Sequence, residues 1–557
     1  MIDFALYRLA FAPALVAVVV LAFSVEGIPE PIPSGLAPAV FESTGAVPVA
    51  RQIVDAAPER QPGSAGDERA ADLVKKSFEE IPGGTVSEQT YDSSYAGEDV
   101  SLRNVILTLP GTSPRTIALI AARDSASGPG AASSAAATGV LVELAQALSA
   151  TDHEKTVVVV STDGGADGAS GARTFLDDYP HRDLIEAALV VSQPGAADRK
   201  QPYLVTSSAG ASSGSVQLAE TAARDIEAAV KQRPDREDAF TQLSRLAFPD
   251  GLGEQAVLID GGVDALAVSA AGERPIPASR DTEEDVSPDS IAEFGRATLA
   301  TVLALDASSA ELSHGPDSYV RIGSNLVPGG SLALLALMLL LPAGAAAVDG
   351  LARASRNALG VAPSLLWATA IAAPPLAALV ALYLFALVGL IPRPAFPFDP
   401  ASFDLGFSEV LVFVVLFGLV AGGYAFLGLL RPSARTSPEA RATATGLVLF
   451  VAALLAWFVN PFLALFGILL AHCWIPVLRF RTGPAVTAAI VAVAALPVVA
   501  AALTAAGAIG AGIWDVILMI AGGQVGAFAC VALVLSGSGA LGLILGSAGN
   551  PQIGNED

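Results

Sequence analysis

Apolar positions follow two different patterns along this chain. One apolar run extends from Phe4 to about Val25, and seven more follow Ser324, each about as long as a bilayer is thick. Between them, residues 26–325 alternate short apolar segments with polar ones, as in a folded domain that faces water. The pattern predicts an N-terminal transmembrane anchor, a water-facing domain and an all-α polytopic transmembrane bundle.

The boundaries of these parts follow from the same pattern. We expect an anchor at 4–25, a domain at 26–306, a juxtamembrane linker at 307–325, a seven-helix transmembrane domain at 326–537 and a tail at 538–557. The seven spans are predicted at about 327–348, 364–391, 408–430, 443–459, 461–478, 484–507 and 515–537. No A-x-A cleavage site follows the first run, so we interpret it as a retained anchor.

Arginine residues in the loops predict the orientation. They fall on alternate loops, at 349–363, 431–442 and 479–483, whereas acidic residues mark the loops near 392–407 and 508–514. Short loops that carry arginine stay in the cytoplasm. We therefore expect both termini in the cytoplasm and residues 26–325 outside the cell, with Arg393 as the one base that disagrees.

Two strand-loop-helix segments stand out in the water-facing domain. A buried strand at Ile117–Ala122 precedes a loop rich in Gly, Ser and Ala and a helix from about Thr138 to Leu148. A β-branched strand at Thr156–Ser161 precedes a Gly-rich turn and another helix. Loops at the carboxyl ends of neighbouring strands are the usual place for an active site in an α/β sheet.

Four stretches of this domain carry motifs of a known family. They are RQPGSAGDERAADLVKKSFEEI (60–81), NVILTLPG (104–111), AARDS (121–125) and DGGADG (163–168). Together they resemble the co-catalytic zinc aminopeptidases, a family that also contains glutaminyl cyclases and the inactive ectodomains of nicastrin and the transferrin receptor. The resemblance covers roughly residues 60–305. It implies an α/β ectodomain with a mixed central sheet and helices on both faces.

The resemblance also locates the family's two-zinc site, and there this sequence departs from the pattern. At the ligand and general-base positions stand Ala122, Ala135, Gly165, Ala166, Ser192 or Gln193, and Pro277 or Ala278. None of these side chains supplies the His or carboxylate ligands that paired zinc ions require, or the glutamate that activates water. The resemblance therefore implies a pseudoenzyme that has no metal cofactor and no catalytic residue.

The polar residues that remain near this position are Arg123, Asp124, Asp163 and Asp167. Arg123 suits either a local ion pair or the carboxylate of a bound peptide, because its planar guanidinium forms paired hydrogen bonds. The histidines offer no obvious replacement site: we expect His153 and His181 away from the cleft, and His314 in the linker. Both cysteines lie in apolar runs, so the ectodomain has no thiol chemistry.

Two polar side chains lie within predicted spans, where such groups are costly. We interpret His472 as an interfacial residue and Gln524 as a helix–helix hydrogen-bonding residue. The spans contain no charged pair or interrupted repeat that would indicate transport.

Charge separates the two halves of the chain. Residues 26–325 carry 45 acidic and 22 basic side chains, which accounts for the whole net charge of −23. Dense carboxylates keep a surface hydrated in concentrated salt, so the composition suggests a halophilic archaeon. The alternative is an acidic patch that recruits a basic partner. Nothing forms a basic stripe, and nucleic acid is excluded as a partner.

The layout of anchor, inactive aminopeptidase-like ectodomain and bundle resembles the large non-catalytic subunit of the GPI transamidase. That resemblance implies a scaffold that presents a substrate tail or a lipid to a separate catalytic subunit, with membrane lipid as the other partner. It also makes the linker 307–325 sensitive to length. Two alternatives remain: a membrane-bound zinc metallopeptidase with displaced ligands, and a lipid- or solute-handling protein with an accessory ectodomain.

Overall fold

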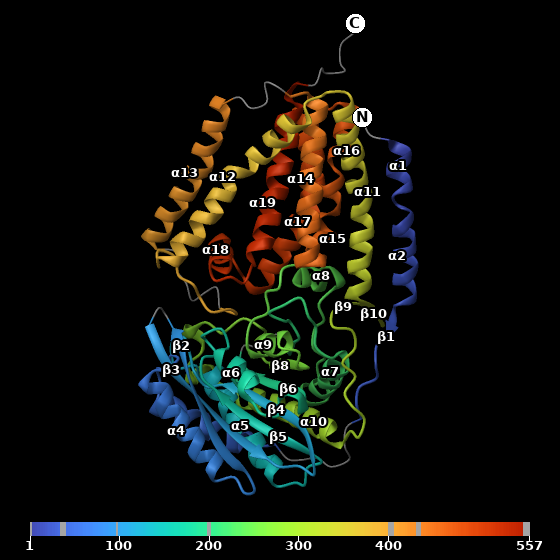
Figure 1. Ribbon diagram of the computed structural model, residues 1–557. Helices are drawn as coiled ribbons and strands as arrows, with labels where there is room; N and C mark the ends of the chain where they lie inside the picture. The colour runs from blue at the N-terminus through green and yellow to red at the C-terminus, as the bar shows by residue number, and fades with distance from the viewer. Residues whose placement is uncertain are drawn as a thin grey trace.

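The computed structural model describes residues 3–33, 41–95, 98–197, 202–398, 406–430 and 436–549. An α/β domain lies below a bundle of long helices, and the first described residues lie at the far end of that bundle (Figure 1). The predicted fold class, a mixed α/β domain joined to an all-α bundle, is confirmed.

The domain is built on one seven-stranded mixed sheet with the order β2-β3-β5-β4-β6-β8-β7. The three central pairs, β5-β4, β4-β6 and β6-β8, are parallel, and the outer pairs are antiparallel. The strands are β2 (Thr85–Tyr95), β3 (Glu98–Leu109), β4 (Ser113–Ala122), β5 (Lys155–Thr162), β6 (Ile185–Ser192), β7 (Tyr203–Val205) and β8 (Ala265–Ser269).

Alternating side chains on these strands make two apolar layers. Ile117, Leu119 and Val157 pack with one set of helices, while Ala118 and Ile120 point to the other face. A run that is apolar at every position is what a central strand needs when helices cover both faces. The sequence VVVV at 157–160 therefore specifies the middle of the sheet.

The first layer is covered by α3, α4, α5, α7 and α10, and the second by α6 and α9. Ser287 caps α10 by accepting a hydrogen bond from the Ser290 amide. The helices, including α8 at the domain surface, are α3 (Ser43–Ala56), α4 (Ala65–Glu79), α5 (Ala136–Ser149), α6 (Ser170–Asp178), α7 (Val216–Val230), α8 (Ala239–Ala247), α9 (Glu254–Asp260) and α10 (Pro288–Ala307).

Eight helical segments outside the domain, among the described residues, are long and apolar enough to cross a membrane. They are α1 (Phe4–Leu9) with α2 (Ala12–Phe23), α11 (Gly329–Arg356), α12 (Val361–Leu387), α13 (Phe407–Leu430), α14 (Pro438–Val459), α15 (Pro461–His472) with α16 (Trp474–Phe480), α17 (Pro484–Ile509) and α19 (Ala527–Gly546). Another apolar segment, Ala131–Ser149, is largely buried inside the α/β domain, so it is not a span.

The last predicted span, 515–537, has the wrong register. The structure divides this run into a short helix, α18 (Ile513–Ala521), and the long α19. The break falls at Gly522 and Gly523, and Gly523 adopts a positive φ of 88° that favours glycine. Residues 538–546 accordingly belong to a span rather than to the predicted tail. The rest of that tail from 550, and the loop arginines Arg431 and Arg435, lie outside the described residues.

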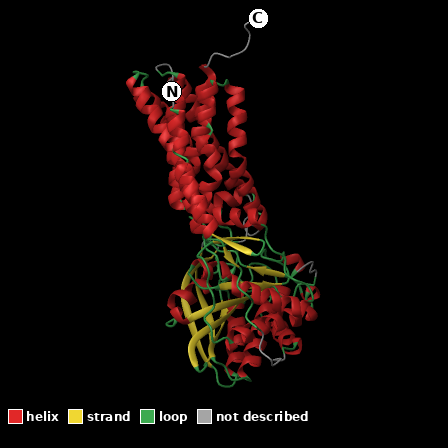
Figure 2. Cartoon of the chain, turned by 90° about the vertical axis from the view of Figure 1, so that its right-hand side faces the viewer, coloured by secondary structure: helices red, strands yellow, loops and turns green. Residues whose placement is uncertain are grey.

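The predicted linker is also partly structured. Residues Tyr319–Ile322 (β9) and Asn325–Pro328 (β10) form a hairpin, and β10 pairs with β1 (Glu26–Gly27), directly after the anchor. This small sheet lies at the junction of the domain and the bundle (Figure 2). It joins the first span to the second, because α11 begins immediately after β10.

The domain is docked against the bundle through several further contacts. Asn460, at the start of α15, donates its side-chain amide to the carbonyl oxygens of Leu246 (2.8 Å) and Ala247 (3.2 Å) at the end of α8. Gln524 donates to the carbonyl oxygen of Pro249 at 2.8 Å. The interpretation of Gln524 as a helix–helix residue is therefore wrong, since the glycine break turns it towards the domain.

His472 links the anchor to the bundle. Its Nδ1 lies 2.9 Å from the Tyr7 hydroxyl, and its Nε2 lies 2.9 Å from the carbonyl oxygen of Leu339. The ring also stacks on Phe11, with 5.8 Å between centroids. His472 therefore holds three helical segments together, α1, α11 and α15. The interpretation of His472 as an interfacial residue did not include this structural role.

Candidate functional site

The cleft that the sequence indicates lies at the carboxyl ends of the parallel strands. Ala122 ends β4, Asp163 follows β5 directly, and Ser192 ends β6. The segment Ala131–Ala135 forms a π-helical turn that runs into α5. The topology therefore brings the predicted positions to one edge of the sheet, as expected for an α/β site.

Small residues close the space where metal ligands would stand. A Cβ atom added at Gly165 would lie 2.5 Å from the Cβ of Ala122, so no side chain fits there without movement. Ala135 is fully buried, while Ala166 is half-buried and Pro277 is exposed. These positions now serve close packing of the loops.

Ser192 and Gln193, the two candidates for one ligand position, have different surroundings. Ser192 is the last residue of β6 and pairs with Ser269 of β8. Gln193 is buried, donates to the carbonyl oxygens of Gly272 and Arg274, and accepts from the Ile276 amide. Gln193 thus holds the loop that leads to Pro277 and Ala278, which are on the rim.

Arg123 forms a buried ion-pair network under the cleft. Its guanidinium lies 2.5 Å from the Asp67 carboxylate and 3.4 Å from that of Asp163, and all three side chains are fully buried. It also donates to the carbonyl oxygens of Ser161 and Arg103. Of the two interpretations of Arg123, the structure supports the local ion pair, because no part of its guanidinium reaches the surface.

Asp124 ties the two neighbouring loops together. Its carboxylate accepts hydrogen bonds from the amides of Gly165 and Ala166, each at 2.8 Å. Burial and the nearby Asp163 raise the pKa of Asp124 to about 6. The carboxylate is thus engaged by the very segment that would carry the catalytic glutamates in the related enzymes.

Arg60 also ties loops of the cleft together through hydrogen bonds. It is fully buried and donates to the carbonyl oxygens of Arg123, Ala57 and Pro129 and to the hydroxyl of Ser134. Asp281 accepts from the amides of Ala132 and Ser133 at the start of the π-helical turn. The loop that would carry the bridging aspartate is therefore fixed by internal bonds.

Sequence reasoning missed Glu254, which begins α9 and reaches the same edge of the sheet. It is 4% exposed, and the Thr162 hydroxyl donates to its carboxylate. Burial raises the pKa of Glu254 to about 7. Asp67 and Arg60 were also missed, although both lie in the motif at 60–81. The only signal for Glu254 was an acidic residue shortly before the apolar run Ala256–Ile259.

The remaining predicted residues lie apart from one another. Asp167 accepts a 2.5 Å hydrogen bond from Ser93 at the rim. His153 contacts the carbonyl oxygen of Leu148, and His314 contacts Asp264 at 2.7 Å. His181 lies beside Tyr179. Within the described ranges, no three His, Cys, Asp or Glu side chains are arranged to hold a metal ion.

Paired zinc ions therefore do not fit this site. The positions that would provide ligands carry Ala, Gly, Ser or Gln, and Pro or Ala, and the Asp124 carboxylate accepts hydrogen bonds from two amides. Zinc bound by neutral imidazole and carboxylate needs three or four such donors around one point. The arrangement instead provides a rigid edge of the sheet, which buried ion pairs stabilise.

Comparison with known proteins identifies the fold of this domain. Residues 104–302 match the model of Peptidase family M28. The domain is aminopeptidase-like, so the resemblance stated from the sequence is confirmed for this part of the chain. No curated protein matches the chain.

Solved structures of the same kind cover about half of this chain. A glutaminyl cyclase from an Acidobacteriales bacterium has 18% identity over 50% of this chain and 99% of its own, with a TM-score of 0.39. The corresponding values for BSAP, a zinc aminopeptidase from Bacillus subtilis, are 12%, 50%, 99% and 0.40. A leucine aminopeptidase precursor from Bacteroides thetaiotaomicron has 15% identity over 49% and 99%, with a TM-score of 0.38.

Proposed function

We propose that this protein is a non-catalytic membrane subunit whose aminopeptidase-like ectodomain acts as a scaffold for a separate catalytic partner. The observation that carries the proposal is the network of Arg123, Asp67 and Asp163, which occupies the base of the cleft with paired charges. The Asp124 carboxylate is bonded to the Gly165 and Ala166 amides, so it is not free to act as a general base.

The role that suits such a protein is to hold two molecules in a defined position relative to each other. The ectodomain is docked on the bundle by Asn460 and Gln524, so anything held by one part has a defined position relative to the other. Holding two reactants together can supply roughly 7–11 kcal/mol of a reaction barrier. We therefore infer that the protein presents a polypeptide or a lipid, as the large non-catalytic subunit of the GPI transamidase does, with the ectodomain outside the cell and both termini inside.

The experiment is purification of the full chain in mild detergent, followed by metal analysis, peptidase assay and mass spectrometry of co-purifying proteins. We expect less than one zinc ion per ten chains, no hydrolysis of aminoacyl substrates, and a stoichiometric partner with its own nucleophile or metal site. Stoichiometric zinc together with chelator-sensitive hydrolysis would establish the metallopeptidase alternative instead. A protein that works without any partner would also overturn the proposal.

A further inference from the structure

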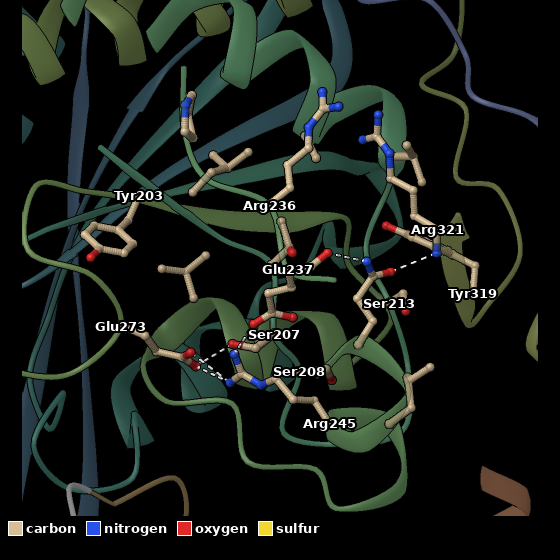
Figure 3. A pocket seen from close by; sticks show the side chains of 18 of the residues that line it. Tyr203, Ser207, Ser208, Ser213, Arg236, Glu237, Arg245, Glu273, Tyr319 and Arg321 are labelled. Atoms are coloured by element: carbon tan, nitrogen blue, oxygen red, sulfur yellow. Dashed lines mark hydrogen bonds and ion pairs between the residues drawn. The ribbon is translucent and has the colours of Figure 1, made fainter. Parts of the chain in front are cut away.

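A cavity of about 450 Å³ lies beside β7, the last strand in the order of the sheet. It is bounded by β7, the loop 206–215, α7, α8 and β9, and it reaches Ala508 at the end of α17 (Figure 3). Its volume is in the range of small-molecule sites. Because Ala508 belongs to α17, the cavity lies where the domain meets the bundle.

On one wall of this cavity a buried carboxylate is surrounded by guanidinium groups. Glu220, which is 9% exposed on its side chain, accepts hydrogen bonds from Arg236 (2.8 Å to each oxygen), from Arg233 (3.1 Å) and from Arg321. Three guanidinium groups thus share one buried carboxylate. Glu227 lies 3.9 Å from Arg233 and is half exposed, and Asp235 and Glu237, which flank Arg236 in the chain, also line the cavity.

Arg236 is the residue best placed to bind a ligand. Both of its bonds to Glu220 use the same terminal nitrogen, and within the described part of the chain its Nε and Nη1 have no hydrogen-bond partner. Burial, together with repulsion from Arg321 and Arg233, lowers the pKa of Arg236 below its usual value despite the pull of Glu220. A planar guanidinium with unused donors is suited to a phosphate or a carboxylate.

The opposite wall is suited to hydroxyl groups. There Arg245 pairs with Glu273, Asp250 and Glu237, so carboxylate oxygens outnumber cations. The adjoining loop adds the hydroxyls of Ser207, Ser208, Ser212 and Ser213. In Figure 3 the Arg245–Glu273 pair and the guanidinium groups of Arg236 and Arg321 lie on opposite sides of the cavity. A ligand with an anion at one end and hydroxyl groups at the other matches both walls.

We propose that this cavity, lined by Arg236, Arg321 and Arg245, binds the phosphate ester of a polyol, the chemistry shared by hydroxylated phospholipid headgroups and free polyol phosphates. The site goes beyond the proposed function, because it requires neither a catalytic partner nor a polypeptide. Its position beside α17 provides a route for a lipid whose tails stay in the bilayer while its headgroup enters the domain.

The test uses the full chain in detergent with glycerol 1-phosphate as the soluble probe and glycerol as the neutral one, measured by calorimetry. A second arm places the protein in phosphatidylcholine nanodiscs with or without phosphatidylglycerol and measures retained lipid by native mass spectrometry. We expect saturable binding of the phosphate-bearing probe in at least one arm, and a loss of roughly tenfold or more in Arg236→Gln, since a charged hydrogen bond is removed. Binding only in the first arm assigns a free phosphate ester, and binding only in the second assigns a lipid.

Arg69→Gln is the matched control, because Arg69 is also exposed and donates only to the Ala56 carbonyl oxygen, far from the cavity. Arg236→Gln leaves Glu220 paired with Arg233 and Arg321, so the fold is retained; hydrogen exchange in α7 verifies this. Arg236→Lys keeps the positive charge but loses the planar guanidinium. Its affinity for the phosphate-bearing probe should lie between those of wild type and Arg236→Gln. Equal binding by wild type and Arg236→Gln, equal binding of glycerol and its phosphate, or no binding in either arm would overturn the proposal.

Discussion

Arg123 lies 2.5 Å from the Asp67 carboxylate, and neither side chain has any contact with solvent. The pair joins α4 to the end of β4, at the base of the cleft. Since Asp163 also faces the same guanidinium, two carboxylates depend on one cation. Burial raises the pKa of Asp67 well above its usual value, and Arg123 opposes that shift.

The first prediction is that Arg123→Met destabilises the ectodomain by about 3–5 kcal/mol, because it leaves two buried carboxylates without their cation. All four tryptophans lie in the bundle, so fluorescence does not report on the domain. Hydrogen exchange of the β4 and β5 amides in the full chain is the suitable measurement. Asp177→Ala, which removes an exposed ion pair with Arg182, should cost less than about 1 kcal/mol. Similar exchange in both variants would contradict this account.

The second prediction concerns pH and Glu254. Its pKa is raised to about 7 by burial, against an unfolded value near 4.3, so the folded state holds a proton that the unfolded state releases. Between about pH 4 and 7 the folded state therefore binds more protons, and stability falls as pH rises. Asp124, with a pKa raised to about 6, acts in the same direction.

Glu254→Gln should remove most of this penalty, because the amide keeps an oxygen for the Thr162 hydroxyl without a buried charge. We expect the variant to be more stable than wild type at pH 8, by an amount on the order of 1–3 kcal/mol, and equal to it near pH 4. Unfolding of the full chain followed by hydrogen exchange across this pH range provides the measurement. A constant difference at every pH would show that Glu254 is not the titrating group.

How far the sequence predicted this structure depends on the distance between interacting residues. The strands at 117–122 and 156–161 and the helix at about 138–148 were predictable, because local apolar patterns define them. The sheet of β1, β9 and β10 was not, since Leu326 pairs with Glu26 across 300 positions. The same rule applies to the site. The absence of the metal ligands was predictable from the motifs, whereas the partners of Arg123 depend on how α4 packs.

The cavity was missed for the same reason. Glu220, Arg236 and Arg321 come from three separate segments and are individually ordinary surface-type residues. The register of the last span was missed because residues 515–537 are almost continuously apolar. Only the backbone conformation at Gly523 decides that α19 starts at Ala527.

The third prediction tests the orientation proposed for the chain. Single cysteines introduced at Gly315 and at Asn357, in a background lacking Cys473 and Cys530, should differ in labelling from outside intact cells. Gly315 has open space around its α-carbon and lies on the ectodomain side, so it should react with an impermeant reagent. Asn357 follows Arg353 and Arg356 and should react only after permeabilisation. Labelling of position 357 from outside would reject the orientation.

The last prediction concerns the junction between the ectodomain and the bundle. If the linker were the only connection, a Gly/Ser insertion within 307–311 would release the domain. The structure adds other connections: Asn460 bonds to the end of α8, and Arg274 donates to the carbonyl oxygens of Gly507 and Ala508. We therefore expect the insertion alone to leave α8 docked, with unchanged hydrogen exchange.

Asn460→Ser isolates the docking contact, because a serine oxygen can still cap α15 through the Phe462 and Leu463 amides while the donor to α8 is lost. The buried Leu246 carbonyl then lacks its partner, at a cost of about 1–3 kcal/mol. Exchange should rise in α8 and stay constant in α15, and combining the change with Arg274→Ala should enlarge the effect. If the linker insertion by itself frees α8, the linker and not the docked surface positions the ectodomain, and placement through Asn460 is refuted.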